Sequence, residues 1–144
     1  MKLYVDADAC PVVPQTLRIA NALGIPVVLV CDTSHEFSNV KAQVILCEKG
    51  TDSADLVLVN QLSPGDFVIT QDYGVAALAL SRGCRAINQD GMEYSDANMD
   101  ALLFSRHMGK KIRAAGGRTK GPKRRTPQQD AEFEQALRTI LENA

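Results

Sequence analysis

Acidic residues follow several apolar stretches of this 144-residue chain at the points where those stretches end. Asp6 and Asp8 come directly after the first stretch, Asp72 follows the run 67–69, and Asp90 follows a shorter apolar run. If these stretches are parallel strands, the carboxylates lie outside the carboxyl edge of the sheet, where ligands bind in open α/β folds. Carboxylates there could hold a divalent cation or stabilise a developing positive charge.

A further acidic pair, Asp52 and Asp55, lies three residues apart at the start of a predicted helix. This spacing places both side chains on one helical face. Neighbouring strands are about 4.8 Å apart, so acids at several strand ends can converge. Converging carboxylates repel one another unless a hard cation lies between them. We therefore predict a Mg²⁺ or Mn²⁺ site formed by Asp6, Asp8, Asp52, Asp55, Asp72 and Asp90, with Asp6, Asp55 and Asp72 as catalytic residues.

Helix capping and phosphatase chemistry are two alternative roles for the acidic residues. Capping accounts for each aspartate taken alone, and Asp8 is well placed to cap a helix that has Pro11 in its first turn. Asp-x-Asp after a first strand also begins phosphatases of the haloacid dehalogenase type, with the first aspartate as nucleophile. Those enzymes need a downstream lysine and another acidic pair, for which Asp72 and Asp90 are poor substitutes. A dinucleotide site is not indicated, because no GxGxxG follows a strand.

The net charge of −1 conceals an uneven distribution. Residues 1–105 carry thirteen acidic and six basic side chains, residues 106–125 carry nine basic and no acidic ones, and residues 126–144 carry four acidic and one basic. A concentrated basic block is typical of polyanion binding, although a solvated tail has the same composition. Glycines and a proline interrupt the block and a helical pattern follows it, which favours an ordered loop over 116–126. The predicted nucleic-acid-binding residues are Arg106, Arg118, Lys120, Lys123, Arg124 and Arg125.

Apolar periodicity predicts strands alternating with helices along a single domain over 1–144. This alternation indicates an α/β fold with a parallel sheet and right-handed crossovers, for which we expect the strand order 3-2-1-4-5. Met99, Leu102, Leu103 and Met108 are expected on one face of a long helix capped by Ser95 or Asp96. The expected strands cover 2–6, 26–31, 43–47, 66–70 and 85–88, and the expected helices cover 11–23, 56–62, 73–81, 96–114 and 127–142.

The bulk composition narrows the class of protein. No apolar run approaches the roughly 20 residues that a membrane helix needs, and no charged-then-apolar signal segment stands at the amino terminus. The cysteines are scattered without a CxxC pair, so we expect reduced thiols rather than a disulfide frame or a zinc site. These features predict a cytoplasmic protein with no membrane partner. The four cysteines are Cys10, Cys31, Cys47 and Cys84.

Four motifs stand in order along the chain, at residues 5–12 (VDADACPV), 50–55 (GTDSAD), 68–74 (VITQDYG) and 118–126 (RTKGPKRRT). Together they resemble the YaiI/YqxD family of bacterial proteins, whose function is uncharacterised. Its members are assigned to PIN-like folds, which include metal-dependent ribonucleases. The resemblance therefore implies a single three-layer PIN-like domain. By position, Asp6 is similar to the acid that ends the first strand, Asp72 to the acid after the fourth, and Asp52 or Asp55 to the helical acid, with Asp8 and Asp90 as additional positions.

Three functional hypotheses follow. The first is a Mg²⁺- or Mn²⁺-dependent nuclease that acts on RNA, in which Asp6 and Asp72 hold the metal and Arg106 neutralises the scissile phosphate. The second is a nucleic-acid-binding protein without catalysis, which would show salt-dependent binding but no turnover. The third is a small-molecule phosphatase, which would turn over a phosphomonoester and have no affinity for RNA.

Overall fold

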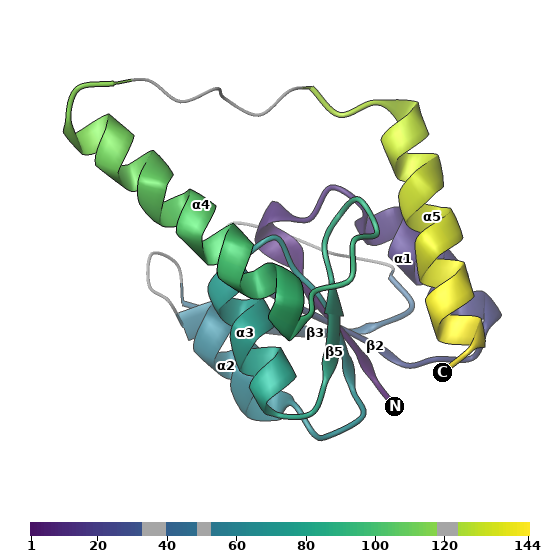
Figure 1. Cartoon of the computed structure of the whole chain (residues 1–144). Helices are drawn as coiled ribbons and strands as arrows, with labels where there is room; N and C mark the ends of the chain where they lie inside the picture. The colour runs from purple at the N-terminus through teal and green to yellow at the C-terminus, as the bar shows by residue number, and fades with distance from the viewer. Residues whose placement is uncertain (33–39, 49–52, 118–123) are drawn as a thin grey trace.

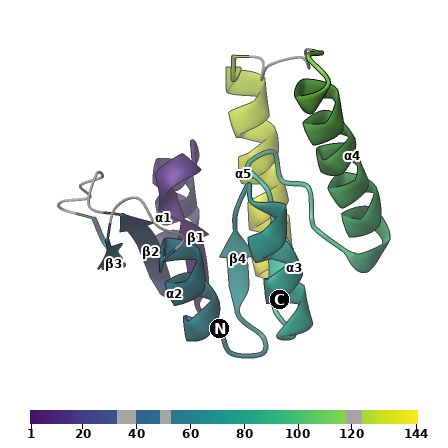
Figure 2. The same ribbon diagram turned by 90° about the vertical axis from the view of Figure 1, so that its left-hand side faces the viewer.

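A computed structural model describes residues 1–32, 40–48, 53–117 and 124–144. Its centre is one parallel five-stranded sheet with the order β3-β2-β1-β4-β5. The predicted α/β class and strand order are therefore confirmed, and β1 lies in the middle of the sheet (Figures 1 and 2). The strands are β1 (Leu3–Asp6), β2 (Val27–Asp32), β3 (Gln43–Cys47), β4 (Phe67–Ile69) and β5 (Arg85–Ile87).

Helices cover both faces of the sheet and make the fold three layers deep. One face packs against α1 and α5, and the other against α2, α3 and the first turns of α4. Capping boxes at Ser95 and Thr126 fix the first residues of α4 and α5, since each box satisfies backbone N–H groups that a helix start leaves without partners. The helices are η1 (Ala7–Ala9), α1 (Val13–Ala22), α2 (Ser53–Gln61), α3 (Tyr73–Ser81), α4 (Asp96–Ala114) and α5 (Pro127–Glu142).

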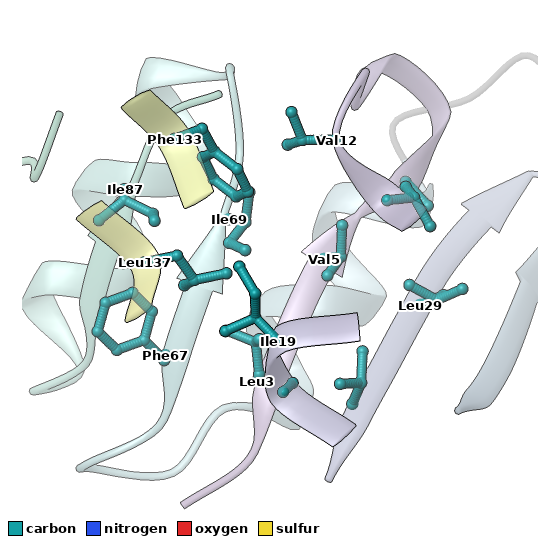
Figure 3. Close-up of a cluster of buried hydrophobic side chains, with 14 of the residues drawn as sticks. Leu3, Val5, Val12, Ile19, Leu29, Phe67, Ile69, Ile87, Phe133 and Leu137 are labelled. Atoms are coloured by element: carbon teal, nitrogen blue, oxygen red, sulfur yellow. The ribbon is translucent and has the colours of Figure 1, made fainter. Parts of the chain in front are cut away.

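The alternation of side chains along each strand divides the core into two clusters. In β1, Leu3 and Val5 belong to the cluster under α1 and α5, whereas Tyr4 belongs to the cluster under α2 and α3. Figure 3 shows the first cluster, in which Phe133 and Leu137 of α5 pack against strand side chains and are fully buried. Strands that are apolar on both faces are typical of a parallel sheet covered on both sides.

Two local expectations are wrong. The first long helix begins at Val13 rather than Pro11, because the short 3₁₀ helix η1 follows β1 directly, and no side chain caps α1 at Val12. Along α4, only Met99 of the expected apolar face is buried. Leu103 and Met108 are 40% and 39% exposed. The second half of α4 extends beyond the sheet (Figure 1), and Met108, nine residues after Met99, also lies on the opposite side of the helix.

Candidate acidic site at the carboxyl ends of β1 and β4

Thr70 links the two strand ends that carry the predicted catalytic acids. Its hydroxyl donates a hydrogen bond to Asp6 Oδ2 over 3.0 Å and accepts one from the backbone N–H of Asp72, also over 3.0 Å. The side chain is 1% exposed. Its backbone is fixed in turn, because its N–H donates to the carbonyl of Ile87 and its carbonyl accepts from the Tyr94 hydroxyl. Thr70 therefore holds Asp6 and Asp72 in a defined relationship across the β1–β4 pair.

Among the acidic residues at this edge, Asp6 has a raised pKa. The pKa of its carboxyl group is raised to about 6, mainly by burial and also by the nearby charges of Asp55, Asp72 and Asp8, against the lowering effect of the Thr70 hydrogen bond. Three carboxylates, from η1, α2 and the β4–α3 turn, thus act on Asp6 at this edge. A carboxyl group in this position is costly to ionise, and a cation or a proton relieves the cost.

Asp72 has a second task as the N-cap of α3. Its Oδ1 accepts hydrogen bonds from the backbone N–H groups of Gly74 at 2.7 Å and Val75 at 3.2 Å. A Cβ atom at Gly74 would lie 3.1 Å from Oδ1, so glycine leaves room for this carboxylate. The capping role is therefore correct for Asp72, and it uses only one of the two carboxylate oxygens.

Asp8 does not cap a helix, so the capping role is wrong for this residue. Both of its carboxylate oxygens lie 3.0 Å from the backbone nitrogen of Asp32, which donates to them from the end of β2. Asp8 thus joins η1 to the neighbouring strand. Asp55 lies in the first turn of α2, as predicted, and is partly buried.

The described residues do not form a complete cation site. Among the described residues, no three His, Cys, Asp or Glu side chains are grouped closely enough to hold a metal ion. The chemistry of the site nevertheless favours a cation, because Asp6 is desolvated beside three other acids, and hard cations prefer carboxylate oxygens completed by water. Asp6 and the second oxygen of Asp72 are the donors best placed for it. Asp52 lies outside the described residues.

Asp90 has a different partner from the other acids. Its Oδ1 lies 2.9 Å from Arg125 Nη1, and the carboxylate is 40% exposed. Arg125 also donates from Nε to Asp130 Oδ1 at 2.5 Å and from Nη2 to the carbonyl of Gln89 at 2.6 Å. The structure therefore makes Arg125 an anchor between the turn after β5 and the start of α5, rather than a residue with all its donors turned to solvent.

The comparison with family models covers nearly the whole fold. Residues 4–143 match the model described as the uncharacterised YaiI/YqxD family. The chain belongs to the YaiI/YqxD family. The resemblance inferred from the four motifs is thereby confirmed.

Relatives named UPF0178 protein align along almost their full lengths. One from Exiguobacterium sibiricum is 52% identical over 141 residues, covering 98% of this chain and 96% of the relative. Others from Ruminiclostridium cellulolyticum and Clostridium acetobutylicum are 50% and 46% identical, covering 95% and 98% of this chain and 90% and 97% of the relatives. Among solved structures, a mutant of Rae1 (YacP) from Bacillus subtilis is similar with a TM-score of 0.48 and 15% identity, covering 99% of each chain. A likeness this weak says nothing about activity.

The basic residues of this YaiI/YqxD-family chain are only partly described. Arg124 is exposed next to the anchored Arg125, and Arg106 belongs to α4. Within the described ranges, no helix is long and apolar enough to cross a membrane. The predicted phosphate-binding residues Arg118, Lys120 and Lys123 lie outside the described residues.

Cys10 lies close enough to Asp6 and Arg125 for the charges of both residues to affect its pKa. Burial raises the pKa of its thiol to about 11, the charge of Asp6 raises it too, and the charge of Arg125 lowers it. The thiol is therefore a packed neutral group, and both Asp6 and Arg125 act on it from nearby. All four cysteines are free, as the prediction of reduced thiols requires.

Three residues at this edge were not identified from the sequence. Thr70 ends an apolar run and stands two residues before an acid, which is the only available signal. Tyr94 is 2% exposed, lies edge-on to Tyr73 at 6.2 Å, and reaches Thr70 from beyond β5. Asp32 contributes a backbone N–H group, and such a contact has no signature in side-chain types.

Proposed function

We propose that this YaiI/YqxD-family protein is a divalent-cation-dependent nuclease that hydrolyses phosphodiester bonds in RNA. The observation that carries the proposal is the desolvated Asp6, whose pKa is raised to about 6 at a strand end shared with Asp8, Asp55 and Asp72. Keeping acids together at such a cost is typical of functional sites rather than of stabilising ones.

In this proposal Asp6 and Asp72 hold Mg²⁺ or Mn²⁺, and Asp8 and Asp55 assist. A cation bound there would polarise the scissile phosphate and orient an attacking water. Thr70 contributes by positioning, because its single hydroxyl fixes Asp6 and the backbone of Asp72 at the same time. Strand ends hold such groups more rigidly than loops do.

The concentration of basic residues in one segment of the chain supports RNA as the substrate. The segment 106–125 carries nine basic and no acidic side chains, and basic surfaces of this density bind phosphate backbones by releasing counterions. Arg125 fixes the end of this segment beside β5 through Asp90 and Asp130. We infer that Arg106, Arg118, Lys120, Lys123 and Arg124 contact the phosphates, while Arg125 keeps the segment in place.

One observation favours a second candidate, an RNA-binding protein without catalysis. Asp8 and Asp72 already accept hydrogen bonds from backbone N–H groups. If these contacts are the sole purpose of the acids, the site holds no cation. Binding of RNA would then depend on salt but not on Mg²⁺ or Mn²⁺.

The deciding experiment is cleavage of labelled RNA and DNA pools in the presence of Mn²⁺ or Mg²⁺. The wild-type chain is compared with the double variant Asp6→Asn, Asp72→Asn and with Glu142→Gln, which removes an exposed acid at the end of α5. We expect RNA cleavage by the wild type and by Glu142→Gln, and none by the double variant. Binding without cleavage by all three would select the non-catalytic protein, and turnover of a phosphomonoester without RNA affinity would select a phosphatase.

A further inference from the structure

From Leu103 to its end, α4 has little cover from the rest of the described chain. It extends away from the sheet and from α5 (Figure 1). Phe104 is 65% exposed, and Leu103, Met108 and Ile112 are 40%, 39% and 43% exposed. Short helices are only marginally stable in water when no apolar face is buried. Four large apolar side chains on such a segment therefore indicate a missing contact.

The two halves of α4 carry opposite charges. Asp96 and Asp100 lie in the first half, whereas Lys110 and Lys111 lie in the second. Within the part of the chain that the structure describes, neither Asp100 nor Lys111 forms an ion pair. The helix therefore offers an acidic and a basic end to the same partner.

Helical spacing places the relevant side chains in one line. Asp100, Phe104, Met108 and Lys111 follow one another at intervals of four, four and three residues, the spacing of a single helical face. Lys110 lies about 100° around the helix from Lys111. The line thus has an acid at one end, apolar side chains in its middle and a base at the other end.

We propose that α4 pairs in antiparallel orientation with α4 of a second copy of this chain. A two-fold axis near residues 105 and 106 puts Asp100 of each copy opposite Lys111 of the other, and brings Phe104 of each copy near Met108 of the other. Such a patch is complementary to itself, as a two-fold interface requires. A parallel pairing would place like charges opposite each other.

A hollow lies beside the acidic end of this line. It has a volume of about 390 Å³ between α3 and α4, and Leu80, Met99 and Leu103 line it together with Asp96 and Asp100. Asp100 belongs both to this hollow and to the line, so the hollow borders the antiparallel contact at that end.

The small surface area that a pair of α4 helices can bury predicts a weak dimer. A standard stable interface buries about 800 Å² on each partner, and a single helix pair buries less than this. We therefore expect a monomer–dimer equilibrium that depends on protein concentration. The dimer would leave Lys110 outside the line of contact, where it stays available to a polyanion.

Sedimentation velocity of the full chain across a concentration series tests the proposal. We expect the wild type to shift toward dimer as its concentration rises, and Asp100→Lys and Lys111→Glu to remain monomeric because each places like charges opposite each other. Lys110→Glu makes the same charge change off the line and should dimerise as the wild type does. Circular dichroism of each variant checks that α4 remains helical.

A charge-complementation experiment distinguishes loss of dimerisation from loss of folding in the single variants. An equimolar mixture of Asp100→Lys and Lys111→Glu has opposite charges at both contacts and should form a mixed dimer, as should the double variant with itself. A wild type that is monomeric at all concentrations would overturn the proposal. Single variants that dimerise normally, or a mixture that stays monomeric, would also overturn it, and loss of RNA affinity in Lys111→Glu with a monomeric wild type would assign the face to RNA.

Discussion

Arg125 Nη1 lies 2.9 Å from Asp90 Oδ1, although 35 residues separate them in the chain. The guanidinium also contacts Asp130 and the carbonyl of Gln89 and is 20% exposed. One side chain thus ties the start of α5 to the turn after β5. The last residues of the basic segment are fixed beside the acidic edge of the sheet by this anchor.

Replacing Arg125 by alanine should destabilise the protein by about 2 kcal/mol, because two carboxylates and a carbonyl lose a charged donor in a partly buried place. Arg124→Ala is the matched control. Arg124 is exposed, so its loss should change the free energy of unfolding by less than about 0.5 kcal/mol. Urea denaturation of both variants measures the difference, and equal effects would contradict the anchoring role.

Asp6→Asn should stabilise the protein at pH 7 by about 3 kcal/mol, since it removes a charge that burial and three acids disfavour. The folded state raises the pKa of Asp6 from 3.8 to about 6. Between these values the folded protein binds a proton that the unfolded chain has lost, so wild-type stability falls as pH rises through this window. The advantage of Asp6→Asn should therefore be small at pH 4 and complete above pH 6.5. Denaturation of both proteins across this range is the measurement, and an Asn variant less stable than wild type at pH 7 would refute this account.

Mg²⁺ or Mn²⁺ should raise the melting temperature of the wild type at pH 7.5, because a ligand that binds only the folded state stabilises it. At a concentration ten times the dissociation constant, the gain is about 1.4 kcal/mol. Asp6→Asn should lose most of this response, and Glu142→Gln should keep it. Thermal unfolding at matched ionic strength separates binding from screening. The same response in all three proteins would indicate no specific cation at Asp6.

The two tasks of Asp72 should separate in a pair of variants. Asp72→Asn keeps an oxygen for Gly74 and Val75 and should leave stability nearly unchanged, because Asn is also a good N-cap. Asp72→Ala removes the cap that these N–H groups contact, at a cost of about 1 kcal/mol. Both should abolish cation-dependent cleavage. Unfolding and cleavage are measured on the same preparations, and normal cleavage by Asp72→Asn would exclude a metal-binding role.

The sheet was predictable because its strands are encoded locally. Apolar, β-branched runs such as 27–31 are buried on both faces wherever they pair, and acids that follow them must lie at the carboxyl edge. Asp72, which follows β4, lies near enough to Asp6 to raise its pKa, as this rule predicts. The contact between Asp8 and the N–H group of Asp32 did not, because its donor is a backbone group 24 residues away.

The exposure of α4 was not predictable for a related reason. Periodicity specifies which side chains share a face. Met99, Leu102 and Leu103 lie within about 100° of one another around the helix, whereas Met108, nine residues after Met99, lies on the opposite side. Periodicity does not specify how far the helix extends past the body that covers it. Met99 is 5% exposed, whereas Leu103, about 40° from it around the helix, is 40% exposed. How far the rest of the protein covers α4 depends on how the layers pack together, and no local stretch of sequence determines it.

The hydroxyl of Tyr94 reaches the carbonyl of Thr70 just before the polypeptide turns into α4. Nineteen helical residues span about 28 Å. A sideways movement of about 5 Å at the far tip therefore corresponds to a tilt of only about 10° at the base, close to where Tyr94 contacts Thr70, the hydrogen-bond donor to Asp6. Because α4 is long, a large displacement of its tip corresponds to a small change of tilt at its base, beside the carboxylates.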